Sequence, residues 1–258
     1  MVDTGQIRIR FYDDCFTRFN DSNINAVKNV ITSFGEDSTR IISCKPLVYF
    51  GLLCHQGILG NYGSCICRGP GNYEDLVQQK LKKELYNFQK DIPDSNCFIY
   101  LSGSFRQNGN LIEKTLTIAH EFQHIVQYSS EKTIFFQNDL IKQYLGIMKE
   151  WDNESYRSHP IEYDAFITSK RINNAMYGED AVNNFLNEIL SISRNDDKNY
   201  WEFIDSIDTA PDYDWISETN KLWEKYKADI ERLYNEKIEA KADPFVENYE
   251  YLNSFGAE

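Results

Sequence analysis

The spacing of hydrophobic residues divides the chain into a first half with strands and helices and a second half with helices alone. Residues 6–12 alternate apolar and polar side chains and predict a strand. The β-branched and apolar residues 40–54 predict one or two strands interrupted near Pro46, and residues 97–102 predict another. The glycine-rich residues 57–73 predict a loop or hairpin. Apolar residues recur at helical spacing in the segments 22–33, 74–91, 110–128, 135–150, 160–176, 179–193, 199–207 and 212–240.

This order of elements predicts an α+β fold with two lobes. Residues 1–130 would form an N-terminal lobe, in which a small mixed sheet is followed by the helix 110–128. Residues 131–258 would form a C-terminal lobe that is mainly helical. If the strand 97–102 lies at the edge of the sheet, it could pair with an extended peptide. The last residues, 242–258, predict either a docked tail or a frayed end.

The helix 110–128 places three chemically reactive side chains in an otherwise apolar sequence. His120 and His124 are four positions apart, so they lie on one face of an α-helix and can point at one metal ion. Glu121 lies about 100° further round the helix than His120 and can reach a water molecule on that metal. Asn110 can cap the helix, with a glutamate three residues later as in a capping box. Zinc suits two imidazoles and an open position, so the sequence predicts one zinc ion, Zn²⁺, here.

A catalytic zinc usually has three protein ligands, so the third must come from another segment. Glu162 is the strongest candidate, because Pro160 suits the first turn of a helix and places Glu162 in that turn. The small side chain of Ala165 would let this helix pack closely on the metal helix. His159 and Asp164 are the rival ligands. If no metal binds here, the Glu162 carboxylate can instead stabilise the start of its helix through the helix dipole.

His159 and two tyrosines are candidates for a second role, the stabilisation of an oxyanion. His159 could donate a hydrogen bond to the oxygen that becomes negative when a carbonyl is attacked, and Tyr163 or Tyr156 could do the same. A histidine before a proline is more often a helix cap or a surface residue, so a purely structural role for His159 also stays open.

Composition and charge narrow the partners. The chain has 258 residues, a formal net charge of -13 and no basic run, which makes nucleic acid an unfavourable partner. The first residues contain no apolar segment typical of a signal peptide, and no apolar run is long enough to span a membrane. We therefore expect a cytoplasmic protein that does not associate with membranes, and whose cysteines are reduced.

The six cysteines stand at positions 15, 44, 54, 65, 67 and 97. Cys54 with His55, and Cys65 with Cys67, could offer a second, structural zinc site. The spacing differs from the usual pairs of zinc-binding cysteines, because two cysteines separated by only one residue are poorly spaced to bind the same metal ion. The simpler interpretation is that these are small apolar residues beside a glycine-rich loop.

The sequence of residues 120–124, HEFQH, followed by a glutamate on a later helix resembles the zincin metallopeptidases of the gluzincin type. The metzincin class is excluded because Gln127 and Ser130 stand where it has glycine and histidine. Residues 162–166, EYDAF, are similar to the Glu-x-x-Ala-Phe helix of the small ImmA/IrrE-type peptidases. Thermolysin-like peptidases instead have an aspartate where Phe166 stands. The resemblance covers residues 115–128 and 160–170.

This resemblance implies a zincin-like fold in which His120, His124 and Glu162 bind zinc. Glu121 would be the general base that takes a proton from water and returns it to the leaving amine. We therefore expect a zinc-dependent metallopeptidase, a hydrolase acting on a protein or peptide substrate. The alternatives are a non-catalytic, zinc-stabilised binding or regulatory domain, and a zinc hydrolase that acts on a non-peptide amide. Retention of Glu121 argues against the binding domain, because a structural zinc site needs no such carboxylate.

Overall fold

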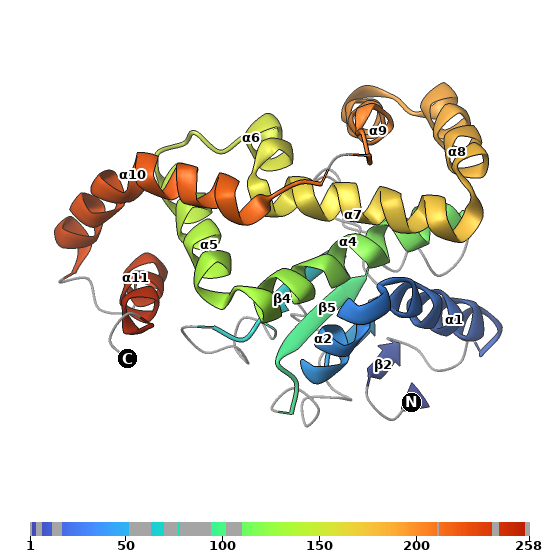
Figure 1. The fold of residues 1–258 in the computed structure, drawn as a ribbon, viewed down its shortest axis with the longest axis horizontal. Coiled ribbons are helices and arrows are strands. Elements are labelled where there is room, and N and C mark those ends of the chain that lie inside the picture. The colour runs from blue at the N-terminus through green and yellow to red at the C-terminus, as the bar shows by residue number, and fades with distance from the viewer. Residues whose placement is uncertain are drawn as a thin grey trace.

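The structure is a computed structural model, which describes residues 2–3, 7–11, 17–51, 63–69, 77, 94–101, 110–210, 212–238 and 243–255 (Figure 1). Apart from Val77, the predicted helix 74–91 lies outside the described residues, and so do Cys54 and His55.

A single mixed sheet forms the N-terminal part of the described chain. Its order is β1 (Val2–Asp3), β2 (Arg8–Phe11), β3 (Leu47–Phe50), β5 (Cys97–Leu101) and β4 (Gly63–Cys67). The three central strands are parallel, whereas β1 and β4 pair antiparallel at the two edges. Ile9, Val48 and Ile99 are register partners and point into the main hydrophobic core. Helices of the described chain pack against this face of the sheet.

One prediction about this region is wrong in part, and one condition is not met. Residues 40–54 were expected to form strands alone, but Ser38–Ser43 form the helix α2, and the strand β3 starts only after Pro46. The β-branched residues there do not decide the conformation, because Ile41 is fully buried from a helical backbone and tertiary packing overrides weak local preference. The strand 97–102 was considered for the sheet edge. It is instead an interior strand, β5, because β4 from the glycine-rich segment pairs with its outer side.

Helices make up the rest of the fold. Their bounds are α1 Thr17–Ser33, the short 3₁₀ helix η1 Gly35–Asp37, α4 Leu111–Ser130, α5 Lys132–Ile147, α6 Asn153–Ser158, α7 Pro160–Tyr177, α8 Glu179–Ile192, α9 Asn195–Ser206, α10 Trp215–Lys237 and α11 Pro244–Ser254. The α+β class and the helical C-terminal region are thus confirmed. The tail is docked, because Phe245 and Leu252 of α11 are buried in the main core.

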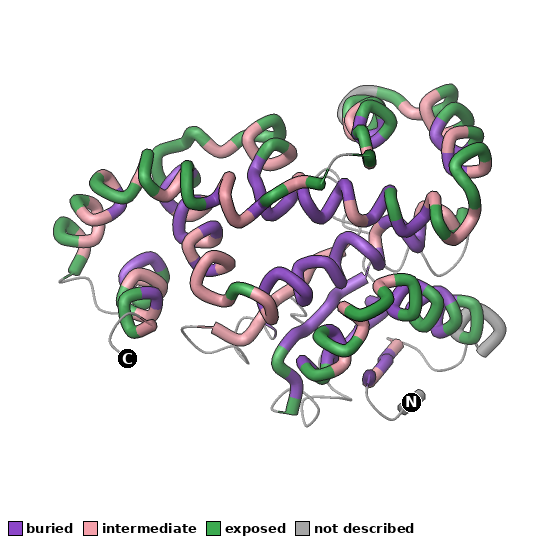
Figure 2. The backbone as a smooth tube through the Cα atoms, in the orientation of Figure 1, coloured by how far each residue is buried: buried purple, intermediate pink, exposed green. Residues whose placement is uncertain are grey.

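Helix α4 lies at the centre of the molecule and is buried along most of its length (Figure 2). As predicted, Asn110 caps it, with its side-chain oxygen accepting a hydrogen bond of 2.8 Å from the amide of Ile112. One face of α4 contributes to the core shared with the sheet, α1 and α5. Leu116 on another face joins a second hydrophobic cluster with Phe166 of α7 and the helices α8 and α9. Within the described residues, no helix combines the length and the apolar character needed to cross a membrane.

Candidate metal centre

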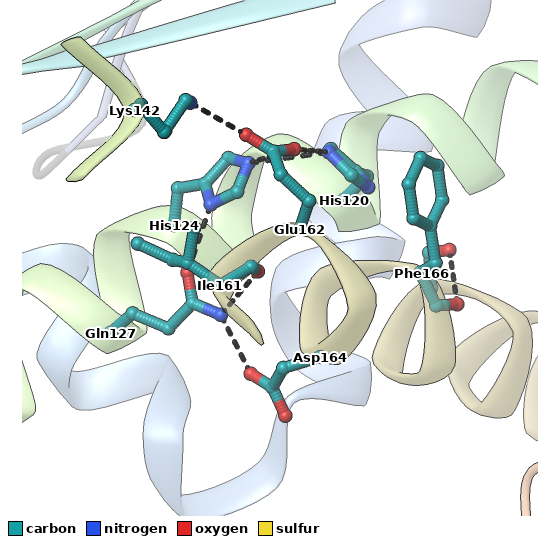
Figure 3. A network of polar contacts seen from close by, with 9 residues as sticks. His120, His124, Gln127, Lys142, Ile161, Glu162, Asp164 and Phe166 are labelled. Atoms are coloured by element: carbon teal, nitrogen blue, oxygen red, sulfur yellow. Dashed lines mark hydrogen bonds and ion pairs between the residues drawn. The ribbon is translucent and has the colours of Figure 1, made fainter. Parts of the chain in front are cut away.

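The two histidines of α4 meet a carboxylate from α7. His120 Nε2 lies 3.2 Å from His124 Nε2 and 3.2 Å from Glu162 Oε2, and His124 Nε2 lies 3.5 Å from the same oxygen (Figure 3). All three residues are buried, and among the described residues they form the one group of potential ligands that converges closely enough to hold a metal ion. Glu162 thus lies where the sequence placed the third ligand, and its binding of zinc stays a prediction.

The spacing of these three atoms can be tested against zinc. Zinc binds histidine nitrogen and carboxylate oxygen at about 2.0–2.1 Å in tetrahedral geometry, which sets any two ligand atoms about 3.3–3.4 Å apart. The observed separations of 3.2, 3.2 and 3.5 Å match one triangular face of such a tetrahedron. The donor set of two imidazoles and one carboxylate is also one that zinc uses in catalytic sites. The residues present are therefore compatible with one metal ion, and their spacing fits zinc.

The orientation of His124 is fixed by Gln127, one turn further along α4. The amide nitrogen of Gln127 donates to Asp164 Oδ2 at 2.7 Å and to the carbonyl of Ile161 at 2.9 Å, so its oxygen must face the histidine (Figure 3). That oxygen lies 2.8 Å from His124 Nδ1 and accepts its proton in a hydrogen bond. The lone pair of Nε2 is then free for a metal. No pattern in the sequence indicated this partner.

The two oxygens of Glu162 have different partners. Oε1 accepts a hydrogen bond of 2.9 Å from the ammonium of Lys142 on α5, while Oε2 faces the histidines. Tyr156 of α6 lies close to this carboxylate. Burial raises the pKa of Glu162, but Lys142 and the histidines lower it well below its usual range. The carboxylate is therefore charged, with one oxygen held by lysine and the other available to a metal.

Tyr156 is a partner of the carboxylate rather than a base. Burial and the negative charges of Glu162 and Glu121 raise the pKa of its phenol well above the usual range, so the hydroxyl keeps its proton. Lys142 was missed in the sequence analysis, because nothing in the pattern of α5 distinguishes it from the other charged residues of that helix. Only the packing of α5 beside α7 brings it to the site.

Glu121 lies outside the ligand group, beside the edge strand. Its side chain is buried, and the backbone of Gly63 in β4 approaches it so closely that a Cβ atom at Gly63 would stand 2.5 Å from Glu121 Oε1. Only a glycine leaves room for the carboxylate at this point. The structure thus brings an edge strand, an acidic side chain and the two histidines to one place.

The other predicted site residues lie apart from the ligand group. His159 precedes α7 and is buried, with its ring against Trp151 at 5.3 Å between centroids. Burial, with the charge of Lys142 adding to it, lowers the pKa of His159 to about 3, so the ring is neutral. Neither ring nitrogen has a hydrogen-bond partner among the described residues. Tyr163 packs against Tyr213 and the helix α9, and its role in catalysis stays a prediction.

Asp164, the second rival ligand, is buried on the far side of Gln127. It accepts hydrogen bonds of 2.7 Å from both Gln123 and Gln127 through Oδ2. Burial raises its pKa, and the two amide donors only partly offset this. Asp164 therefore acts on the centre through Gln127 in this structure, and Glu162 is the carboxylate that faces the histidines.

Comparison with protein-family models, with curated proteins and with solved structures finds no match to this chain. The support for a function therefore comes from the geometry of His120, His124, Glu162 and the residues around them.

Proposed function

We propose that this protein is a zinc-dependent metallopeptidase of the zincin type. The observation that carries the proposal is the convergence of His120, His124 and Glu162 at the spacing of a tetrahedral zinc site. An ordinary polar cluster does not require a histidine tautomer fixed through Gln127 together with a carboxylate whose two oxygens are divided between a lysine and the histidines. Both features favour a metal.

The chemistry follows from the positions of these groups. A zinc ion held by the triad would polarise a substrate carbonyl and make a water molecule more acidic. Glu121 follows His120 directly on α4 and is the acid–base group, which accepts a proton from the attacking water and passes it to the leaving amine. Tyr156 keeps its hydroxyl proton and stands beside Glu162, so it can donate a hydrogen bond to an oxyanion.

The edge strand supports a peptide as the substrate. The outer side of β4 pairs with no strand in the described part of the chain. An extended peptide that adds to this side by backbone hydrogen bonds would run past Gly63, which contacts Glu121. Such pairing gives affinity through the main chain and brings a peptide bond near the acid–base group. This is the role considered for the strand 97–102, transferred to the strand that forms the edge.

The test is the variant Glu121→Gln, which keeps the shape of the side chain and removes its basicity. Hydrolysis of fluorescently labelled casein by the zinc-loaded protein should fall at least 100-fold, while zinc content by elemental analysis stays at one ion per chain. Glu113→Gln on the same helix is the matched control and should retain both. Unchanged hydrolysis in Glu121→Gln would show that this residue is not the base.

A non-catalytic zinc-stabilised domain is the second candidate, favoured by the burial of the ligands. His120, His124 and Glu162 are 7%, 9% and 4% exposed, which is also typical of a structural site. In that case the wild type binds zinc without cleaving casein or any component of a mixed peptide library, and removing zinc with a chelator unfolds the chain.

A further inference from the structure

Four cysteine thiols lie in a row beneath the edge of the sheet. Cys65 Sγ is 3.7 Å from Cys67 Sγ on β4, and Cys67 Sγ is 3.3 Å from Cys97 Sγ on β5. The thiol of Cys44, at the end of α2, is the next neighbour of Cys97. Cys44 and Cys97 are buried, whereas Cys65 and Cys67 are partly exposed. The row therefore leads from the surface into the core.

The register of the sheet pairs two of these thiols directly. Cys67 and Cys97 are partners in the antiparallel ladder of β4 and β5. The next pair along is hydrogen-bonded, because the amide of Arg68 donates to the carbonyl of Asn96 at 2.7 Å. Cys67 and Cys97 are therefore a non-hydrogen-bonded pair, in which the Cα atoms lie about 4.5 Å apart and the side chains are closest. A disulfide requires Cα atoms about 4.4–6.8 Å apart, so this pair can close without moving the strands.

The other pairings and a metal are less favourable. Cys65 and Cys67 lie two positions apart on one strand, about 6.6 Å between Cα atoms, with side chains that run parallel rather than toward each other. For a thiolate metal site, three or more sulfurs would have to converge, and within the described residues no such group of cysteines comes together closely enough. The four sulfurs therefore form a row of neighbours rather than a group around a common centre.

We propose that Cys67 and Cys97 form a redox-active dithiol that closes into a cross-strand disulfide when it meets a small disulfide such as oxidised glutathione. The partly exposed Cys67 passes its proton to the neighbouring Cys97 thiolate, 3.3 Å away, as its sulfur attacks a glutathione sulfur and forms a mixed disulfide. The first glutathione leaves as a thiolate and takes this proton back from Cys97. The Cys97 thiolate then attacks the Cys67 sulfur and releases the second. The pair, with Cys67 protonated and Cys97 ionised, loses one proton and two electrons, and one glutathione disulfide becomes one thiol and one thiolate.

The surroundings of Cys97 support its role in the second step. Burial raises the pKa of the Cys97 thiol, but the neighbouring thiols of Cys44 and Cys67 and the positive charge of Lys132 lower it to about 6. A buried thiolate that oxidised glutathione cannot reach directly is suited to displace glutathione from its neighbour. Cys67 shares its strand with Gly63, so the modified strand is the one that contacts Glu121.

The test uses the full chain, incubated with oxidised glutathione and then denatured in the presence of an alkylating agent. Peptide mapping by mass spectrometry should recover a cross-linked pair of peptides containing Cys67 and Cys97, which dithiothreitol separates again. The variant Cys65→Ser should form the same cross-link. The variant Cys67→Ser should form none, with circular dichroism confirming that it is folded.

Three results would overturn the proposal. Alkylation of both Cys67 and Cys97 after oxidation would show that no disulfide forms between them. A cross-link that joins Cys65 to Cys67, or that involves Cys15 or Cys54, would show that another pair is the reactive one. A second zinc ion per chain that disappears in Cys67→Ser would identify a thiolate metal site instead. None of these readouts depends on hydrolysis, so they stand apart from the proposed peptidase activity.

Discussion

Replacing Glu162 by glutamine separates a zinc site from a metal-free polar cluster. The substitution keeps the volume of the side chain and removes the charge that faces two histidines on one side and Lys142 on the other. In a metal-free cluster, Lys142 would already neutralise the carboxylate, and zinc would change nothing. In a zinc site, the variant loses an anionic ligand. The difference between the melting temperatures with and without zinc is therefore the quantity to compare.

Its size follows from linkage. At a zinc concentration about 100 times the dissociation constant, a ligand that binds only the folded state stabilises it by about 2.7 kcal/mol. For a chain of this length, that corresponds to an increase of about 5–10 °C in melting temperature. Loss of the carboxylate should weaken zinc binding at least about 100-fold, since even the loss of a group that only orients a ligand costs about 10–100-fold. At the same zinc concentration the variant then gains only about 0.4 kcal/mol, or about 1–2 °C.

The zinc-free variant should itself be less stable, because Lys142 loses its anionic partner. Complete burial of the pair would make this cost about 3–5 kcal/mol, but the lysine side chain is 30% exposed, so about 1–3 kcal/mol is expected. Each protein must therefore be compared with its own zinc-free form. Asp164→Asn is the matched control on the same helix, and it should keep the zinc-induced increase, since its amide oxygen can still accept hydrogen bonds.

The assay is differential scanning calorimetry of chelator-treated protein with and without added zinc, accompanied by elemental analysis. A zinc-induced increase in Glu162→Gln equal to that of the wild type would refute the assignment of this residue as a ligand. If Asp164→Asn alone lost the increase, Asp164 would take its place. No bound zinc and no increase in the wild type would leave the triad as a buried polar cluster that Lys142 neutralises.

Three further predictions concern the surroundings of the site. Gln127→Leu should weaken zinc binding by about 10–100-fold, because the ring of His124 loses the hydrogen bond that orients it. Gln123→Leu loses only a hydrogen bond to Asp164, so it should lower stability but leave zinc affinity unchanged. Calorimetric titration with zinc distinguishes the two variants. Gly63→Ala should destabilise the protein by about 1–3 kcal/mol, because the added methyl group would clash with the Glu121 side chain. Gly146→Ala, whose methyl group would meet no atom within 4 Å, should be close to neutral in urea unfolding. Burial lowers the pKa of His124, but the nearby carboxylates raise it above its usual value, so a proton competes with zinc at higher pH than for a free imidazole. Competition with a coloured chelator should show the zinc affinity falling by at least about tenfold per pH unit below that pKa. A zinc affinity that does not change between about pH 8 and pH 5 would contradict this prediction.

The elements that depend on local chemistry were predictable from the sequence. Helix α4 was expected at residues 110–128 and spans Leu111–Ser130, with Asn110 as its cap. Its two histidines fall on one face because an i to i+4 spacing allows nothing else in a helix. Helix α7 begins at Pro160, as the fixed backbone angle of proline and its missing amide proton indicate. Periodicity and caps act within a few residues, so the chain itself carries them.

Tertiary structure decided what these elements meet. Glu162 comes to His120 across 42 positions of the chain, and Lys142 comes to the same carboxylate from a third helix. The strand β4 forms the edge in place of β5, and this pairing sets Cys67 opposite Cys97 and Gly63 against Glu121. The register of a sheet and the faces on which helices pack depend on the fit of distant side chains, and no local spacing encodes that fit. The sequence by itself determined the helix that carries the two histidines and indicated Glu162 as their carboxylate partner. Only the packed fold supplied Gln127, which orients His124, and Lys142, which holds the charge of Glu162.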